Sequence, residues 1–372
     1  MPKRWEAAVS AKLVSRRQEE LWMGAIVLSG ASAWAAMATM AGLRRVQISI
    51  IELLFSFAPL VIVPLGLELA GRLERAGSGR TYSLRLVLPI AATAAACLAV
   101  LLRPGHAAAW FGVPWVVYCA CLVCERGRRR NRTWSLTSFI LDIAYVDLAI
   151  GAVWFVISRA GLRPFGFQEP IILLTAVHFH YSGYGTALVA AATLKWFEMH
   201  GLRSQPLRWL LLLLALLPFA VAAGFVLSPA LRFLAALLFV ACLGALTRTL
   251  LSISSDMQNW HARLYLRLAA GTVAASLAFA GMYAVSECFG KGWITIARMA
   301  NTHGVLNSLG FVLFGISGWL IELYASVSTP TKRTTVPRRK DEVLFSGGAR
   351  EHFSGIDPSS VPEFVARDFY DR

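Results

Sequence analysis

The sequence predicts an all-α fold, a polytopic transmembrane helix bundle of about ten spans with both termini in the cytoplasm. Three observations predict this fold class. Hydrophobic residues make up 57% of the 372 residues and charged residues only 15%, whereas a soluble domain carries about a quarter charged residues. The mean hydropathy is +0.58. Runs of about 20 apolar residues, the length that crosses a bilayer as a helix, recur along the chain.

Ten apolar segments are long enough to span the bilayer. They lie at roughly 21–43, 46–70, 84–102, 105–125, 136–158, 169–193, 207–227, 229–253, 264–287 and 295–325. Short loops join them, so residues 21–325 are expected to form one transmembrane domain. With the N-terminus inside, the cytoplasmic segments hold most of the 36 Lys and Arg residues, as the positive-inside rule requires. The net charge of +15 therefore indicates topology and a lipid partner, not nucleic acid.

The two ends of the chain differ from the apolar segments. Residues 1–20 are too long and too mixed in charge for the n-region of a signal peptide. They are typical of an amphipathic helix on the cytoplasmic surface. Residues 326–372 are basic and contain prolines, which predicts a largely flexible cytoplasmic tail.

The second and fifth spans carry carboxylates at membrane depth. An ionisable side chain there costs about 2.5–3.5 kcal/mol on insertion scales, so it is a functional candidate by default. Glu52 is expected ~9 Å in from the outer edge, and Asp142 ~9 Å from the cytoplasmic edge. Asp147 is expected ~16 Å from the outer end of its span. Pro59 and Pro64 predict a kink in the second span.

The sixth span contains the polar segment TAVHFHYSGYG, residues 175–185. Its histidines, His178 and His180, are expected ~13 and ~16 Å below the outer edge. On a regular helix they project about 200° apart, so a single site could use both only if the helix is distorted. Gly183 and Gly185 permit such a distortion or a close helix contact. Tyr184 shares the face of His180.

The last span contains ANTHGVLNSLGF, residues 300–311. His303 is expected ~12 Å deep, and Asn307 stacks on the same face four residues later. Gly304 and Ser308 form a small-xxx-small pair that allows another helix to approach. Shared depth with the fifth and sixth spans predicts one polar site in the outer half of the bilayer. The candidate residues for binding a substrate or a proton are Glu52, Asp142, Asp147, His178, His180, Tyr181, Tyr184, His303 and Asn307.

Two of these segments also carry a family resemblance. PFGFQEPIILLTAVHFHYSGYG and ANTHGVLNSLGFVLFGISGW together resemble the YndJ-like family of bacterial membrane proteins, and APLVIVPLGL and LDIAYVDLAIGAVW fit the same pattern. The likeness covers most of residues 46–325. A serine in HFHYSGY, where the family pattern favours alanine, is a mild departure. The resemblance implies a multi-pass protein of the bacterial cytoplasmic membrane, and the family is sometimes labelled a transporter.

Three functions fit these residues. The first is a proton- or ion-coupled transporter, because prolines that break helices and buried carboxylates beside histidines are the ingredients of coupling at mid-membrane. The second is a membrane redox protein that binds haem or a divalent metal through His178, His180 and His303. The third is an assembly or sensing protein, which binds partner helices or subunits and in which the polar cluster is structural. No soluble catalytic motif is present, which argues against an enzyme.

Overall fold

The computed structural model describes residues 23–74, 82–129 and 135–328. Every regular secondary-structure element in these residues is a helix. Each of the ten predicted spans contains a helix. The helices are Met23–Gly42, α2 (Ile50–Phe57), η1 (Ala58–Ile62), α3 (Val63–Leu73), α4 (Tyr82–Leu101), α5 (His106–Arg129), α6 (Leu136–Arg159), η2 (Pro164–Gly166), α7 (Ile171–His178), η3 (Phe179–Gly185), α8 (Thr186–Met199), α9 (Gln205–Leu227), α10 (Pro229–Asp256), α11 (Trp260–Cys288), α12 (Ile296–Met299), η4 (Ala300–Gly304), η5 (Leu306–Val312) and α13 (Leu313–Ser328).

Eight of the described helices are long and apolar enough to cross a membrane by themselves, and a shorter apolar helix covers Leu88–Leu101. The chain is therefore a multi-pass membrane protein. The predicted segment 1–20 lies outside the described residues. The predicted tail begins within α13, which continues to Ser328, and the rest of that tail also lies outside the described residues.

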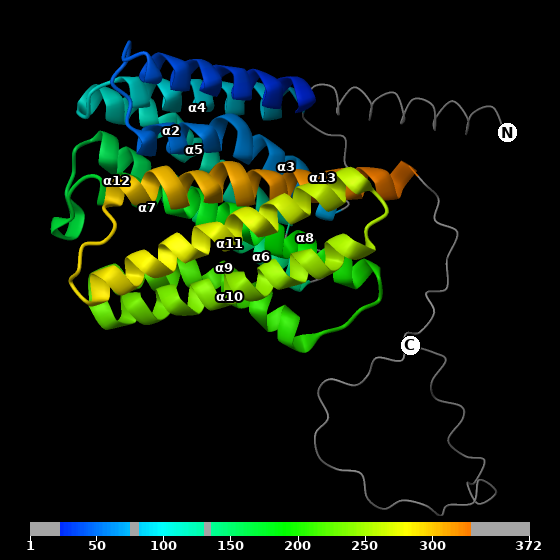
Figure 1. Ribbon diagram of the computed structural model, residues 1–372. Helices are drawn as coiled ribbons and strands as arrows, with labels where there is room; N and C mark the ends of the chain where they lie inside the picture. The colour runs from blue at the N-terminus through cyan, green and yellow to red at the C-terminus, as the bar shows by residue number, and fades with distance from the viewer. Residues whose placement is uncertain (1–22, 75–81, 130–134, 329–372) are drawn as a thin grey trace, which may run out of the picture. The chain divides into compact units, whose positions relative to one another are not determined.

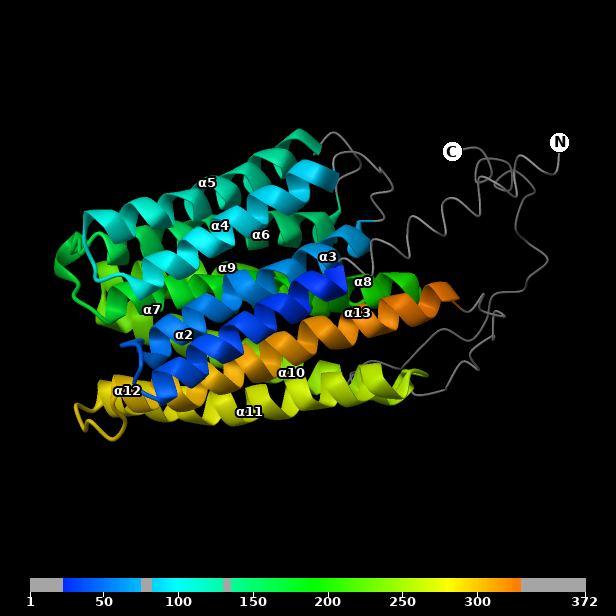
Figure 2. The same ribbon diagram turned by 90° about the horizontal axis from the view of Figure 1, so that it is seen from above.

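Helices that follow one another along the chain pack side by side (Figures 1 and 2). Helix α5 packs against α4 and α6, and helix α10 packs against α9 and α11. The first described helix begins, and α13 ends, at the same end of the bundle. We call this end, where α5 also ends, the Arg126 end. The opposite end, where α2 begins and α6 ends, is called the Glu52 end.

The helix formed by α7, η3 and α8 lies at the centre of the bundle. It contacts α2, α3, α6, α9 and α13, and every residue from 179 to 194 is buried. By contrast, only 6% of the Met23–Gly42 span is buried. The central helix is thus enclosed by protein over its middle, while the first described helix lies at the periphery.

Three helices contain π-helical segments, which are uncommon and occur frequently at functional sites. They are η1, η3 and the pair η4 and η5. Segment η3 contacts both η1 and η5, so the π-helical segments meet near the middle of the bundle. Hydroxyl groups bond to carbonyl oxygens in two of them: Thr186 Oγ1 donates to Tyr181 O at 3.2 Å, and Ser308 Oγ donates to Gly304 O at 2.7 Å.

The sequence explains why these segments depart from the α-helix. Pro59 has no N–H and cannot donate to the preceding turn. At this point the Ala58 N–H bonds to Phe55 O and not to Leu54 O, four residues back. In η3 the glycines allow neighbouring groups to approach the backbone. A Cβ on Gly185 would lie 2.6 Å from Val312 Cγ1 of η5, so this glycine lets η3 and η5 meet.

Candidate functional site

One face of α6 organises the centre of the protein. Arg159, Phe155, Gly151 and Asp147 are spaced four residues apart and therefore lie along one side of the helix. All four are buried. Each of the four residues contacts a group on α2 or η3. Asp147 lies ~18 Å from Arg159 along the helix axis.

Asp147 packs directly against the backbone of η3. A Cβ on Gly183 would lie 2.7 Å from Asp147 Cβ, 2.7 Å from Cγ and 2.9 Å from Oδ2. The Asp147 side chain is fully buried, and neither carboxyl oxygen has a hydrogen-bond partner among the described residues. An unpaired carboxylate is very costly in such surroundings, so the geometry favours the neutral carboxyl group.

His180 lies one turn of α6 away from Asp147, beside Gly151. A Cβ on Gly151 would come 2.6 Å from His180 Nδ1. That nitrogen lies 2.8 Å from Ala176 O, and because a carbonyl only accepts, Nδ1 carries the proton. Trp115 Nε1–H then donates to His180 Nε2 at 3.2 Å. Both ring nitrogens are engaged, which leaves no lone pair for a metal, although the sequence predicted His180 as one ligand.

His178 faces a different neighbourhood. Its Nδ1 lies 2.7 Å from Leu174 O, and it alone among residues 176–194 keeps an exposed side chain. The two histidines of the HFHY segment thus point to different partners, as the helical spacing predicts.

His303 is held by α11. Its Nδ1 lies 3.1 Å from Ser276 O and 2.8 Å from Ser276 Oγ, and Ser276 Oγ also lies 3.3 Å from His303 O. Ser276 is buried, whereas His303 is half-buried. Asn307 lies four residues further along, buried in η5.

The two tyrosines of η3 bond to the second span. Tyr181 Oη donates to Leu54 O at 2.6 Å, and this is the carbonyl that the Ala58 N–H does not reach. Tyr184 Oη donates to Val63 O at 3.3 Å. Both side chains are buried. These tyrosines therefore satisfy carbonyl groups where a proline-containing helix is irregular.

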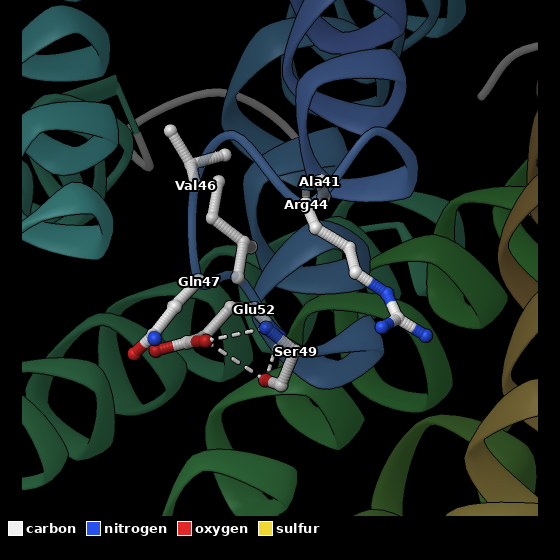
Figure 3. Close-up of a pocket in the computed structure, with 7 residues that line it drawn as sticks. Ala41, Arg44, Val46, Gln47, Ser49 and Glu52 are labelled. Carbon is white, nitrogen blue, oxygen red and sulfur yellow. Dashed lines mark hydrogen bonds between the residues drawn. The ribbon is translucent and has the colours of Figure 1, made fainter.

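Glu52 lies at the end of the bundle, away from Asp147. It closes the start of α2 in a capping box, where Glu52 Oε2 accepts from Ser49 N at 2.8 Å and from Ser49 Oγ at 2.9 Å. Glu52 Oε1 accepts from the buried Arg159 Nη1 at 2.9 Å. Figure 3 shows the Ser49–Glu52 bonds at the edge of an open pocket of about 500 Å³. It is lined by Ala41, Arg44, Val46, Gln47, Ile48, Ser49 and Glu52.

Asp142 lies toward the Arg126 end. Arg126 Nε donates to Asp142 Oδ1 at 2.6 Å, and Arg126 Nη1 donates to Glu74 Oε1 at 2.6 Å. Arg126 Nη2 also bonds to Ser138 O at 3.1 Å, and the guanidinium lies 5.2 Å from the centroid of the Tyr145 ring. The network ties α3, α5 and α6 together at this end.

The structure thus divides the predicted residues among several places. Asp147 and His180 lie one turn of α6 apart between α6 and η3, whereas His303 is held by Ser276 of α11. Glu52 and Asp142 belong to ion pairs at opposite ends. Sequence reasoning did not find the partners Trp115, Arg126, Arg159 and Ser276, because the lateral order of the helices is not readable from spacing. The one available signal was the four-residue spacing from Asp147 to Gly151 and on to Arg159.

Helices of membrane length packed around a buried polar helix define a polytopic α-helical membrane protein with a polar intramembrane centre. The chain belongs to the YndJ-like protein family, whose model matches residues 53–311. This range contains Asp147, His180 and His303, and Glu52 lies one residue before it. The uncharacterized membrane protein YndJ of Bacillus subtilis (strain 168) is similar, with 28% identity over 186 residues. The match covers 50% of this chain and 33% of that relative, so the chain spans about a third of the relative's length. No solved structure matches the chain.

Proposed function

We propose that the protein is a proton-coupled transporter of the bacterial cytoplasmic membrane in which Asp147 binds the coupling proton. The observation that carries this proposal is the fully buried Asp147 carboxyl group without a hydrogen-bond partner among the described residues. Ionisable residues at this depth mark ion and proton pathways. A carboxyl group that is neutral when buried becomes ionised when water reaches it, and this difference lets a conformational change release a proton.

The tight packing around Asp147 favours a proton over a larger ion. The Asp147 carboxyl carbon lies next to the Gly183 backbone, with no room for even a methyl group between them. A metal cation would need several oxygen ligands around it. A proton needs only one carboxyl oxygen.

The π-helical segments are the parts of the helices that would change conformation during transport. Secondary transporters place coupling sites where helices are interrupted at mid-membrane. Here Asp147 contacts η3, and η3 contacts η1 and η5. A change of η3 from π-helical to α-helical winding would turn Gly183 relative to α6 and would uncover the carboxyl group.

Two measurements on purified protein test this role. Infrared spectra in H₂O and D₂O should show the carbonyl stretch of a protonated carboxylic acid, which is lost in Asp147→Asn. In liposomes that hold a potassium diffusion potential, any proton flux that an internal pH dye reports with wild-type protein should be absent with Asp147→Asn.

Asp256→Asn is the matched control, because Asp256 is an exposed aspartate at the end of α10. It should keep both signals. Circular dichroism and gel filtration show that each variant is folded. The absence of a protonated-acid band in wild-type protein, or an unchanged band in Asp147→Asn, would refute the proposal.

A further inference from the structure

We propose that the open pocket at the Glu52 end binds a small solute through a carboxylate group, with the Arg44 guanidinium as its partner. The pocket has a volume of about 500 Å³, and pockets for small molecules measure about 300–1,000 Å³. That the protein carries this solute across the membrane rests on the proposed transport function. The binding itself does not, and it can be measured at equilibrium.

Arg44 brings a positive charge to this pocket. It lines the pocket and is exposed, and its side chain forms no hydrogen bond or ion pair with another residue in the described part of the chain. Figure 3 shows the Arg44 guanidinium on the opposite side of the view from the Gln47 amide and the Glu52 carboxylate. The guanidinium donors of Arg44 are therefore available to a ligand.

The other charges at the pocket cancel each other. Glu52 Oε1 accepts from Arg159 Nη1 at 2.9 Å, and Glu52 Oε2 accepts from Ser49 N and Ser49 Oγ. Arg159 is buried behind Glu52, and its Nε has no hydrogen-bond partner among the described residues, so the floor of the pocket keeps a buried donor. The Glu52 and Arg159 charges sum to zero. The charge of Arg44 then leaves one net positive charge, which attracts a monoanion.

The backbone at Arg44 adopts a conformation that glycine would adopt more easily. Its φ is 55°, in the left-handed region where a residue with a Cβ is strained. It follows the helix Met23–Gly42, and many helices have a glycine at this place. Arg44 N donates to Ala41 O and Arg45 N donates to Met40 O, each at 2.9 Å. Backbone groups thus complete the helix end without the arginine side chain, which is free to serve a ligand.

The lining favours a carboxylate that is attached to a small apolar group. A guanidinium presents two parallel N–H donors that match the two oxygens of a carboxylate. One net positive charge balances one carboxylate, whereas a phosphate monoester carries about −1.5 to −2 at neutral pH. Ala41, Val46 and Ile48 add apolar surface, and the Gln47 amide can donate or accept a hydrogen bond. The solute class that fits is a small monocarboxylate.

The test is equilibrium binding of carboxylates by the full chain in detergent micelles. Saturation-transfer NMR titrations use acetate, butyrate and benzoate as probes, and acetamide, butyramide and benzamide as their neutral counterparts of similar shape. Wild-type protein should bind at least one of the acids, and its amide at least about tenfold more weakly, because a charge-assisted hydrogen bond is lost. Arg44→Gln should weaken binding of that acid by a similar factor.

The next residue provides a matched control. Arg45 is also exposed but does not line the pocket, so Arg45→Gln removes the same charge and should bind like wild-type protein. Asp147→Asn should also bind the acid unchanged. Failure of the pocket and failure of proton coupling are therefore distinguishable.

Two further variants separate a binding role of Arg44 from a structural one. Arg44→Gly should lose binding while its denaturation midpoint stays equal to or above that of wild-type protein, since glycine adopts a positive φ without strain. Arg44→Lys keeps the charge and loses the paired donors, so its affinity should lie between those of wild-type protein and Arg44→Gln. A lower midpoint for Arg44→Gly would contradict the claim that the side chain is free for a ligand.

Four outcomes would overturn the carboxylate site. They are no binding of any of the three acids by wild-type protein, equal binding by wild-type protein and Arg44→Gln, equal binding of an acid and its amide, and tighter binding of a phosphate than of the acids. For the last outcome, inorganic phosphate and micelles that contain phosphatidylglycerol are tested separately. Binding of either that Arg44→Gln loses would assign the pocket to a free phosphate or to a lipid headgroup.

Discussion

The carboxyl group of Asp147 lies against the backbone of Gly183, so close that a methyl group on this glycine would come within 2.7 Å of the carboxyl carbon. The contact joins α6 to the π-helical part of the central helix. It also leaves no space for a side chain between the carboxyl group and η3. Glycine at position 183 is therefore part of the site even though it offers no functional group.

Gly183→Ala should destabilise the protein. The added Cβ must displace Asp147 or the backbone of η3, and overpacking of this kind costs about 1–3 kcal/mol. Unfolding in mixed micelles with increasing sodium dodecyl sulfate measures the change in free energy. Gly244→Ala is the control, because a Cβ there has nothing within 4 Å; it should be neutral or slightly stabilising. Equal effects of the two substitutions would show that the Asp147 contact is not tight.

Trp115→Phe should cost about 1–3 kcal/mol of unfolding free energy. It removes the indole N–H that donates to His180 Nε2 and leaves that buried acceptor unpaired. Trp110→Phe is the matched change on the same helix, since Trp110 is 73% exposed and Trp115 is fully buried. Only the buried position should lower the denaturation midpoint. A similar midpoint for both variants would mean that the Trp115–His180 bond is not needed.

Arg159→Met should cost about 3 kcal/mol or more, because it leaves the Glu52 carboxylate partly buried without its ion pair. Adding Glu52→Met should recover part of this loss. Lys195→Met, which breaks the more exposed pair with Glu198, should cost less than about 1 kcal/mol. A double-mutant cycle on Glu52 and Arg159 measures the coupling, and additive single effects would contradict a direct interaction.

Tyr181→Phe should destabilise the protein more than Tyr184→Phe. The Tyr181 hydroxyl bonds to Leu54 O at 2.6 Å, whereas the Tyr184 hydroxyl lies 3.3 Å from Val63 O. Loss of the shorter bond leaves a buried carbonyl unsatisfied and should cost about 1–3 kcal/mol. The weaker bond should cost about 1 kcal/mol or less. The two phenylalanine variants differ by position alone, so the reverse order in unfolding midpoints would contradict the geometry.

Much of the fold could be predicted from the sequence, because apolar length alone defines a membrane helix. The predicted fifth span, 136–158, differs by one residue from α6, and the other spans also contain helices. The π-helical segments were only partly foreseen. Pro59 predicted an irregular second span and Gly183 and Gly185 allowed a distortion of the sixth, but propensity does not tell a π-helical segment from a kink.

The site was harder to predict than the spans. Depth is a one-dimensional quantity. It grouped Asp147 and His180, which pack against neighbouring turns of α6 and η3, but it also grouped Glu52, which the structure pairs with Arg159 at the end of the bundle. Which helices are neighbours depends on packing between all of them. For the same reason, the Trp115 hydrogen bond to His180 could not be inferred, although both residues are visible in the sequence.

The enclosure of residues 179–194 has a consequence for how the protein is made. This stretch faces protein on every side, and its helix is not among those apolar enough to span a membrane unaided. Of the helices that enclose it, α2, α3 and α6 precede this segment along the chain, and α9 and α13 follow it. Its enclosure during synthesis is therefore complete only after the last helix has been made.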